Sequence, residues 1–324
     1  MHGDWRRKLQ NERIPPASVL SPLEAIGMTP VVQLRKIVPP HAADVFVKLE
    51  YFNTTGSYKD RMALSMIEEA EARGDLRPGM TVVEYTGGST GSSLAFVCAV
   101  KGYRFQVVSS DAFSKEKLDT MTAFGAELHI VRSEGGRVTP DLVPRMIKQA
   151  EILAEEEGTY FTNQLHNPDA VVGYRSIGKE LVQQIEGDID VFCGGVGTSG
   201  MLMGVAQEVK RSHSGARIVA LEPSTSAVIS GHDAGTHHIE GIGIGFVPPL
   251  LDDELYDEVR AIDEGEARRT ARMLAKEEGI FAGTSSGLNI AAALQLAEEI
   301  GEGRRVATVA VDTGLKYLTG DLFS

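Results

Sequence analysis

Short apolar, β-branched runs recur along the chain, and between most of them apolar residues return at helical spacing. The runs that predict strands are residues 45–49, 81–84, 105–109, 128–131, 190–192, 218–221 and 306–311. The stretches that predict helices are residues 61–73, 92–100, 115–124, 142–156 and 201–211. This alternation predicts an α/β protein with parallel sheets and right-handed crossovers. Because such sheets bind ligands beyond the carboxyl ends of their strands, functional residues are expected in the loops there.

Length and composition narrow the class of protein. The chain has 324 residues, which fits two domains of ordinary size, and 42% of them are hydrophobic, as in a globular protein. The net charge of −13 argues against nonspecific binding to nucleic acid or to an anionic membrane surface. No apolar run approaches the roughly 18 residues of a membrane span, and no secretory signal follows the basic residues near the N-terminus. We therefore expect a cytoplasmic globular protein.

Two residue types could signal a metal or a disulfide, and neither does so here. Cys98 and Cys193 both lie in apolar runs, which predicts reduced, buried thiols. His232, His237 and His238 have no cysteine or acidic residue at ligand spacing, so we interpret them as solvated histidines of a surface loop. We predict no metal.

Three strand-to-helix loops, residues 84–91, 194–200 and 283–287, combine glycine with hydroxyl residues; the third precedes an apolar helix expected from Leu288. Main-chain N–H groups and hydroxyls at such helix N-termini converge on a phosphate or carboxylate. Each loop is also consistent with a tight turn capped by Ser or Thr. The last strand ends in residues 312–314, which place another hydroxyl at the same kind of position. Four such segments suggest one crevice.

The second loop also spells a dinucleotide fingerprint. Gly195, Gly197 and Gly200 have the required spacing, and Glu222 ends the next strand where a ribose-binding acid would lie. On these residues alone, a nicotinamide-dependent oxidoreductase and a binder of a monophosphate cofactor both remain open.

Lys59 stands out among the lysines because it lies just beyond a predicted strand, at the start of a predicted helix. A helix N-terminus and the neighbouring Arg61 both disfavour the ammonium form, which predicts a lowered pKa and a nucleophilic amine.

The order of the motifs resembles the cysteine synthase (O-acetylserine sulfhydrylase) and cystathionine β-synthase family of pyridoxal-phosphate enzymes. The resemblance runs from residues 29–34 to residues 314–318, and its most specific pieces are residues 53–61, 241–248 and 283–287. It argues against dinucleotide binding, because residues 195–200 take the place of the family's phosphate loop. It implies a two-domain α/β protein of fold type II, similar to tryptophan synthase β, with pyridoxal 5'-phosphate in the interdomain cleft.

The resemblance also implies boundaries and partners. Residues 1–30 are expected to form an N-terminal arm, residues 31–52 with 166–324 a large cofactor-binding domain, and residues 53–165 a small, mobile substrate domain. A homodimer is expected, and the C-terminal peptide of a serine acetyltransferase is a possible partner.

The site residues carry over position by position. Lys59 is expected to hold the cofactor as an imine, and Thr313 to face its pyridine nitrogen. The residues expected to hold the phosphate are Gly197, Thr198, Ser199, Gly200 and Met201, with Met201 in place of a threonine. The residues expected to bind the substrate are Thr86, Gly87, Gly88, Thr90, Gln164 and Gly243.

Two positions depart from the family's Thr-Ser-Gly-Asn-Thr-Gly pattern. Gly87 replaces the serine. Ser89 replaces the asparagine that contacts the cofactor's ring oxygen and lies near the β-carbon of the substrate. These two changes are expected to affect the choice of the second substrate, the nucleophile, more than the binding of the cofactor.

The reaction implied is β-replacement on an O-activated serine (O-acetylserine or O-phosphoserine) with sulfide, which gives cysteine through an aminoacrylate. One alternative is the same site with an amine or a larger thiol as nucleophile, or β-elimination as a serine, threonine or cysteine lyase. Another is a cofactor-holding regulatory pseudoenzyme, against which an intact Lys59 argues.

Overall fold

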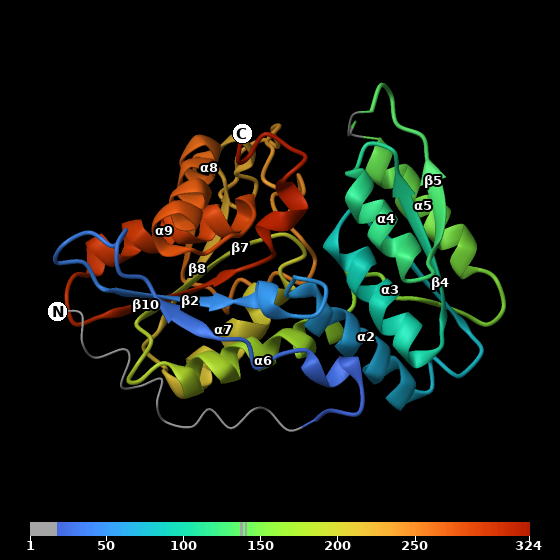
Figure 1. Cartoon of the computed structure of the whole chain (residues 1–324), viewed down its shortest axis with the longest axis horizontal. Helices are drawn as coiled ribbons and strands as arrows, with labels where there is room; N and C mark the ends of the chain where they lie inside the picture. Colours follow the sequence, from blue (N-terminus) through green and yellow to red (C-terminus); the bar gives the residue numbers. More distant parts are fainter. Residues whose placement is uncertain (1–17, 137–138, 140) are drawn as a thin grey trace.

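The computed structural model describes residues 18–136, 139 and 141–324, which form two sheets lying side by side (Figure 1). The larger sheet has the strand order β1-β2-β10-β7-β8-β9. Its strands are β1 (Val31–Gln33), β2 (Asp44–Leu49), β7 (Val191–Gly195), β8 (Arg217–Pro223), β9 (Glu258–Ile262) and β10 (Arg305–Ala310). All neighbours are parallel except β1, which pairs antiparallel with β2 at the edge.

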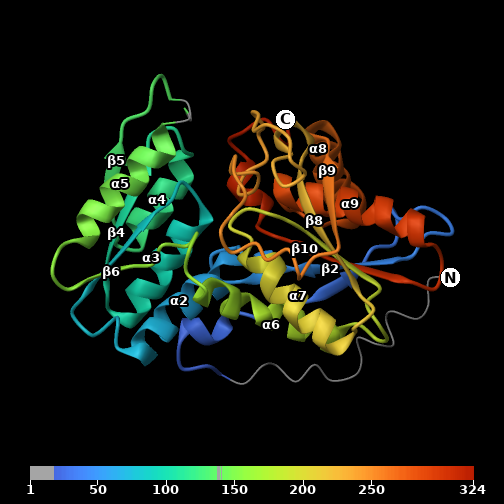
Figure 2. The same cartoon turned by 180° about the vertical axis from the view of Figure 1, so that it is seen from behind.

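Helices cover both faces of the larger sheet, as Figure 2 shows from behind. One face carries α6 (Asp169–Gln184) and α7 (Gly200–Ser212), and the other carries α8 (Glu264–Met273) and α9 (Thr284–Ile300). Successive residues of β7 enter opposite cores: Phe192 packs on the α6 and α7 side, and Val191 and Cys193 pack on the α9 side. A strand buried on both faces needs a continuous apolar run, which is the pattern that predicted it.

The smaller sheet has four parallel strands in the order β5-β4-β3-β6. They are β3 (Thr81–Tyr85), β4 (Arg104–Ser110), β5 (Glu127–Val131) and β6 (Thr159–Phe161). Helices α3 (Ser89–Lys101) and α4 (Lys115–Ala123) pack on one face, and α5 (Leu142–Ala154) packs on the other. Helix α2 (Lys59–Arg73) packs against both α3 and α6, so one apolar core continues from the small sheet to the large one.

Short helical turns connect these elements. They are η1 (Pro22–Ala25), η2 (Glu50–Phe52), η3 (Ser224–Ser226), the π-helical η4 (Leu274–Glu278) and η5 (Gly314–Tyr317). In the described part of the chain no helix combines the length and apolarity that crossing a membrane requires. The predicted N-terminal arm is described only from residue 18 onward, so residues 1–17 lie outside the described part.

The predicted elements are confirmed with shifted ends. Helices α2, α3 and α9 begin at Lys59, Ser89 and Thr284 instead of residues 61, 92 and 288. For α3 and α9 the reason is that their first turns consist of serine, threonine and glycine, which look like loop residues in a sequence although they suit helix N-termini. The first residues of α2, Lys59 and Asp60, are charged and extend no apolar pattern, so the spacing placed its start at Arg61. Asp190 lies before β7 and accepts the N–H of Arg305 instead of extending the strand.

Several elements escaped prediction: β1, β6, β9, α6 and α8. Both cysteines are free and buried, as predicted. The prediction of solvated histidines is wrong for His237, which is half-buried with its Nε2 2.9 Å from the main-chain oxygen of Gly243.

Candidate functional site

Lys59 is the first residue of α2 and lies beyond the carboxyl end of β2. Its side chain is only 8% exposed, and Nζ lies 5.0 Å from the centre of the Tyr58 ring and 6.0 Å from that of Tyr174. Burial lowers the pKa of Lys59 to about 8, against the opposing influence of the Glu84 and Asp312 carboxylates. Nζ makes no hydrogen bond or ion pair with another described residue, so the amine is free to react.

The cause predicted for this lowered pKa is wrong in part. Arg61 does not contribute, because its guanidinium points into a buried charge cluster of Lys48, Glu50, Arg61 and Glu180, here called the Arg61 cluster. Arg61 Nε donates to Glu50 at 2.8 Å and Nη1 donates to Glu180 at 2.6 Å, while Lys48 pairs with Glu180 at 2.7 Å. Desolvation of Lys59 is the main cause of its shift, and the cluster anchors the helix that carries it.

The predicted substrate loop lies between β3 and α3. Thr86 Oγ1 accepts the N–H of Gly88 at 3.1 Å, which closes a tight turn. Thr90 Oγ1 donates to Gln164 Oε1 at 2.8 Å, and Gln164 Nε2 donates to the main-chain oxygen of Tyr85 at 3.3 Å. The structure therefore brings the loop and Gln164 together through two hydrogen bonds.

Glu84, at the end of β3, organises this loop and was missed. Its buried carboxylate accepts from the N–H groups of Tyr85 at 2.9 Å and Gln164 at 3.0 Å and from the Thr162 hydroxyl at 2.8 Å. Burial raises its pKa to about 7, and these hydrogen bonds oppose the shift. A charged residue within an otherwise apolar predicted strand was the signal that could have revealed it.

Gly87 has a physical reason to be glycine. A Cβ at this position would lie 2.3 Å from the ring of Phe113, which is half-buried and follows β4. The ring occupies the space that the family's serine side chain would need. Phe113 is thus a second residue that sequence reasoning missed, and nothing in the sequence joins the two positions.

The predicted phosphate loop, residues 195–200, runs from the last residue of β7 to the first residue of α7. Ser199 adopts a left-handed conformation with φ 65°, and a Cβ on Gly197 would lie 2.2 Å from the main-chain oxygen of Gly241. Gly243 donates its N–H to the first carbonyl of the loop at 3.0 Å. The predicted residues of both segments therefore meet in one backbone cradle at the N-terminus of α7, which suits a phosphate.

Met201 is expected to contact the phosphate, and the structure restricts how it could do so. Its side chain is buried in the core, with Cε 2.6 Å from the point where a Cβ on Gly194 would stand. Only its main-chain N–H, in the first turn of α7, is left to face the loop. Ser199 Oγ donates to the main-chain oxygen of Thr198 at 2.6 Å, which folds the turn onto itself.

Thr313 reaches the lysine segment from the other end of the chain. Ser57 and Asp312 form an isolated antiparallel bridge, and Thr313 donates its N–H to the Gly56 carbonyl at 2.9 Å. The Thr313 methyl packs so closely on Gly56 that a Cβ there would stand 2.7 Å from it. Lys59 and Thr313 therefore share one corner of the site.

Ser89, the first residue of α3, accepts a hydrogen bond from Lys316 Nζ at 3.1 Å. Lys117 of α4 forms an ion pair with Glu240, in the segment just before Gly241. Both contacts join the side of the small sheet to that of the large sheet across the site.

These residues fit pyridoxal phosphate. The free, largely buried amine of Lys59 suits an aldehyde, and the N-terminus of α7, where Gly197 packs directly on the main chain of Gly241, presents main-chain N–H groups to a phosphate. The hydroxyl of Thr313 lies at the same corner as Lys59.

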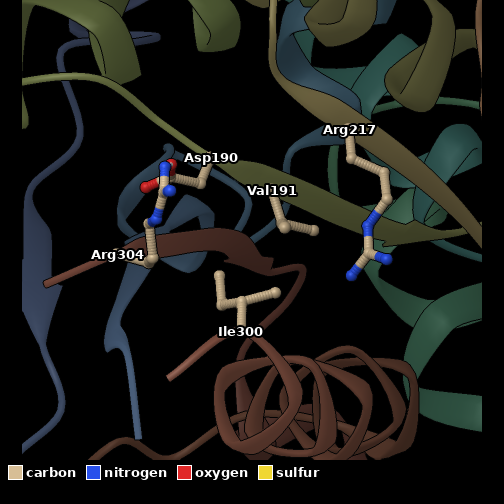
Figure 3. A pocket seen from close by; sticks show the side chains of 5 residues that line it. All are labelled: Asp190, Val191, Arg217, Ile300 and Arg304. Atoms are coloured by element: carbon tan, nitrogen blue, oxygen red, sulfur yellow. The ribbon is translucent and has the colours of Figure 1, made fainter. Parts of the chain in front are cut away.

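Two hollows lie elsewhere on the molecule. The first, of about 250 Å³, is at the amino ends of the large sheet's strands (Figure 3). The residues that line it are Asp190, Val191, Arg217, Ile300 and Arg304. The second, of about 280 Å³, lies between the segment around Met28, helix α2 and helix α6. None of the predicted site residues lines either hollow.

Comparisons with known proteins agree with this geometry. A family model described as pyridoxal-phosphate dependent enzyme matches residues 23–312. A cysteine synthase of Staphylococcus aureus (strain N315) is 46% identical over 303 residues, which cover 93% of this chain and 96% of that protein. An O-ureido-L-serine synthase of Streptomyces lavendulae is 40% identical over 303 residues, 93% of this chain and 91% of that one.

Solved structures give the same result. A cysteine synthase from Entamoeba histolytica has a TM-score of 0.89 at 34% identity, over 96% of this chain and 93% of that chain. An O-ureido-L-serine synthase has a TM-score of 0.87 at 40% identity, over 94% and 95%. The predicted fold type is therefore confirmed. The chain belongs to the family of pyridoxal-phosphate-dependent enzymes, and pyridoxal 5'-phosphate is its cofactor.

Proposed function

We propose that this enzyme catalyses β-replacement on an O-activated serine, O-acetylserine or O-phosphoserine, with sulfide, and so forms cysteine. The observation that carries the proposal is the free, buried amine of Lys59, placed where the glycine and hydroxyl loops of both sheets converge. The relatives named cysteine synthase support the choice of reaction.

Lys59 supplies the reactive amine and the base. When bound, pyridoxal phosphate withdraws electrons from Cα of an amino acid, which permits loss of the Cα proton and departure of the β-substituent. Because the pKa of Lys59 is about 8, about a tenth of its amine is neutral at pH 7, far more than for an exposed lysine, and this fraction can take that proton at Nζ.

The loop between β3 and α3 binds the substrate carboxylate in this proposal. The donors left for the carboxylate are the Thr86 hydroxyl proton and the main-chain N–H of Thr90, which lies in the first turn of α3, where a helix leaves such groups without an internal partner. The Gly88 N–H and the Thr90 hydroxyl shape the loop instead, through their bonds to Thr86 and Gln164. A helix N-terminus favours a negative group by about 0.3–1 kcal/mol at an exposed site and by more when partly buried. The charge of the substrate thus selects its orientation.

The loop before α7 holds the cofactor phosphate, and Thr313 faces the ring nitrogen. The neighbouring carboxylate of Asp312 is turned away, because both its oxygens accept from the Tyr317 hydroxyl, at 3.2 and 3.0 Å. A neutral hydroxyl does not enforce a protonated ring, and this suits β-elimination and replacement better than transamination.

A second candidate is the same chemistry with a different nucleophile, or β-elimination as a lyase. The observation that favours it is the altered loop: Phe113 covers Gly87, and the Ser89 hydroxyl stands where the family pattern has an amide. A relative that is 40% identical to this chain is named O-ureido-L-serine synthase, not cysteine synthase, which supports keeping a second candidate.

Domain limits and assembly belong to the same proposal. We take residues 31–52 with 166–324 as the large domain and residues 53–165 as the small one, a division that the two sheets support. A homodimer is supported by exposed apolar side chains near the N-terminal segment, such as Leu20, Met28 and Phe52. Sedimentation of the purified protein tests it, and a serine acetyltransferase C-terminal peptide can be added in the same experiment.

The deciding experiment is absorption spectroscopy of the purified enzyme with O-acetylserine, then with sulfide, and mass analysis of the product. We expect a cofactor band that changes with O-acetylserine and returns when sulfide is consumed, with cysteine as product. A band that changes but does not return with sulfide would instead favour another nucleophile. Absence of any cofactor band would overturn the proposal.

A further inference from the structure

Lys316 contributes the only described side-chain hydrogen bond to Ser89. Lys316 belongs to η5, which follows the last strand of the large sheet, whereas Ser89 begins α3 beside the small sheet. The distance from Nζ to Ser89 Oγ is 3.1 Å. Both side chains are half-buried, so the contact is partly shielded from water.

The charges around Lys316 leave its ammonium available for Ser89. Burial lowers the pKa of Lys316, the carboxylates of Asp312, Asp60 and Glu240 oppose this shift, and Lys117 reinforces it. Each of these carboxylates is hydrogen-bonded or ion-paired to another side chain. Lys316 Nζ makes no ion pair within 4 Å in the described part of the chain, and the one hydrogen-bond partner of Nζ there is Ser89.

The direction of the bond follows from the chemistry of the two groups. A lysine ammonium has three donors and no acceptor, so Ser89 Oγ must accept. The hydroxyl proton of Ser89 is then free for a third group, and the bound cation polarises the O–H and makes it a stronger donor. A serine alone would rotate among several partners.

We propose that Lys316 is a positioning residue that fixes the Ser89 hydroxyl as a hydrogen-bond donor toward the ring oxygen of the cofactor. The pair then replaces the single asparagine side chain of the family pattern: the shorter serine supplies the donor, and the lysine supplies its direction and a positive charge. The inference rests on the proposed function, because it takes the cofactor to lie between Lys59 and the α7 loop.

The test removes the lysine and measures cofactor binding in place of turnover. Apoenzyme of wild type and of Lys316→Met is titrated with pyridoxal phosphate, and the absorption maximum and dissociation constant are recorded. Hydrogen bonds to charged groups contribute about 1.5–3 kcal/mol, so we expect binding to weaken roughly 10-fold to 100-fold and the band to shift. Lys316→Arg keeps a cationic donor and should retain most of the affinity.

Two further variants separate positioning from a general structural role. Ser89→Ala should reproduce the effect of Lys316→Met, and the double variant should be no worse than either single one, because the two residues act as a unit. Ser89→Asn should restore affinity and band position in the Lys316→Met background. The matched control is Lys115→Met, which removes an exposed lysine of α4 that pairs with Asp119 and should leave both readouts unchanged.

An unchanged spectrum and affinity in Lys316→Met would overturn the inference while leaving the proposed function intact. Additive losses in the double variant would overturn it as well. A wild-type enzyme that shows no cofactor band would overturn the proposed function and the inference together.

Discussion

Lys48, in β2, and Lys59, at the start of α2, are both buried, at 0% and 8% exposure, yet their surroundings differ completely. Lys48 Nζ pairs with Glu180 at 2.7 Å and donates to the Thr29 carbonyl at 2.5 Å and to Gln184 at 2.8 Å. Lys59 Nζ faces two aromatic rings and has no such partner among the described residues.

The comparison shows that burial alone does not create a nucleophile. Desolvation is the largest influence on the pKa of either lysine and lowers it, but the Glu180 carboxylate holds Lys48 in place as a structural cation. Lys59 keeps its lone pair accessible because no described residue forms an ion pair or hydrogen bond with its Nζ, although Glu84 and Asp312 favour the ammonium form from a distance. The Arg61 cluster anchors α2, whereas the amine of Lys59, at the start of the same helix, remains available for reaction.

The largest expected effect comes from Lys59→Ala. Without the amine, covalent attachment of the cofactor should disappear and turnover should fall by at least about a hundredfold, since both nucleophile and base are lost. Borohydride reduction followed by peptide mass spectrometry checks the attachment. A reducible linkage retained in the variant would contradict the assignment of Lys59.

Arg61→Met disrupts the Arg61 cluster, to which Lys48 belongs. Removing one partner of a buried ion network leaves Glu50 and Glu180 undercompensated, so we expect a loss of about 3–5 kcal/mol in the free energy of unfolding. Urea unfolding measures it. The control Arg73→Met removes a half-exposed arginine of the same helix and should cost much less. If the pKa of Lys59 changes in the folded Arg61→Met variant, Arg61 does influence that pKa, contrary to the interpretation given above.

The pH dependence of apoenzyme stability sharpens the contrast. The pKa of Lys59 is about 8 in the folded protein and 10.5 when unperturbed, so the unfolded chain binds more protons between these values. Stability should therefore rise with pH from about 8 to 10.5, by the share that Lys59 contributes. Melting curves of wild type and Lys59→Met apoenzyme isolate that share. Parallel pH profiles would show that the amine is not perturbed.

The smallest effect is expected at Gly87. Gly87→Ser places a side chain against the Phe113 ring, and overpacking of this kind costs about 1–3 kcal/mol. We expect a higher KM for the amino-acid substrate with a smaller change in kcat. Phe113→Ala combined with Gly87→Ser should recover KM, because the two positions are coupled. Equal KM values in the wild type and in both variants would remove Phe113 from the site.

The sequence predicts much of this fold because parallel strands buried on both faces leave continuous apolar runs, as at β7. It also locates the site, because Lys59 and the glycine loops follow strands. It does not predict contacts between residues that are distant in the sequence, such as Phe113 with Gly87 or Lys316 with Ser89, because no regular spacing along the chain relates these positions. Glu84 and the direction of Arg61 depend likewise on packing.

The last strand of the described chain, β10, lies in the middle of the large sheet, between β2 and β7. During synthesis on the ribosome, β2 and β7 would therefore emerge long before the strand that joins them. The small sheet uses one continuous stretch, from Thr81 to Phe161, and can fold on the nascent chain earlier. The cofactor pocket assembles only once β10 has inserted, so we expect ribosome-stalled chains that lack it to leave pyridoxal phosphate unbound.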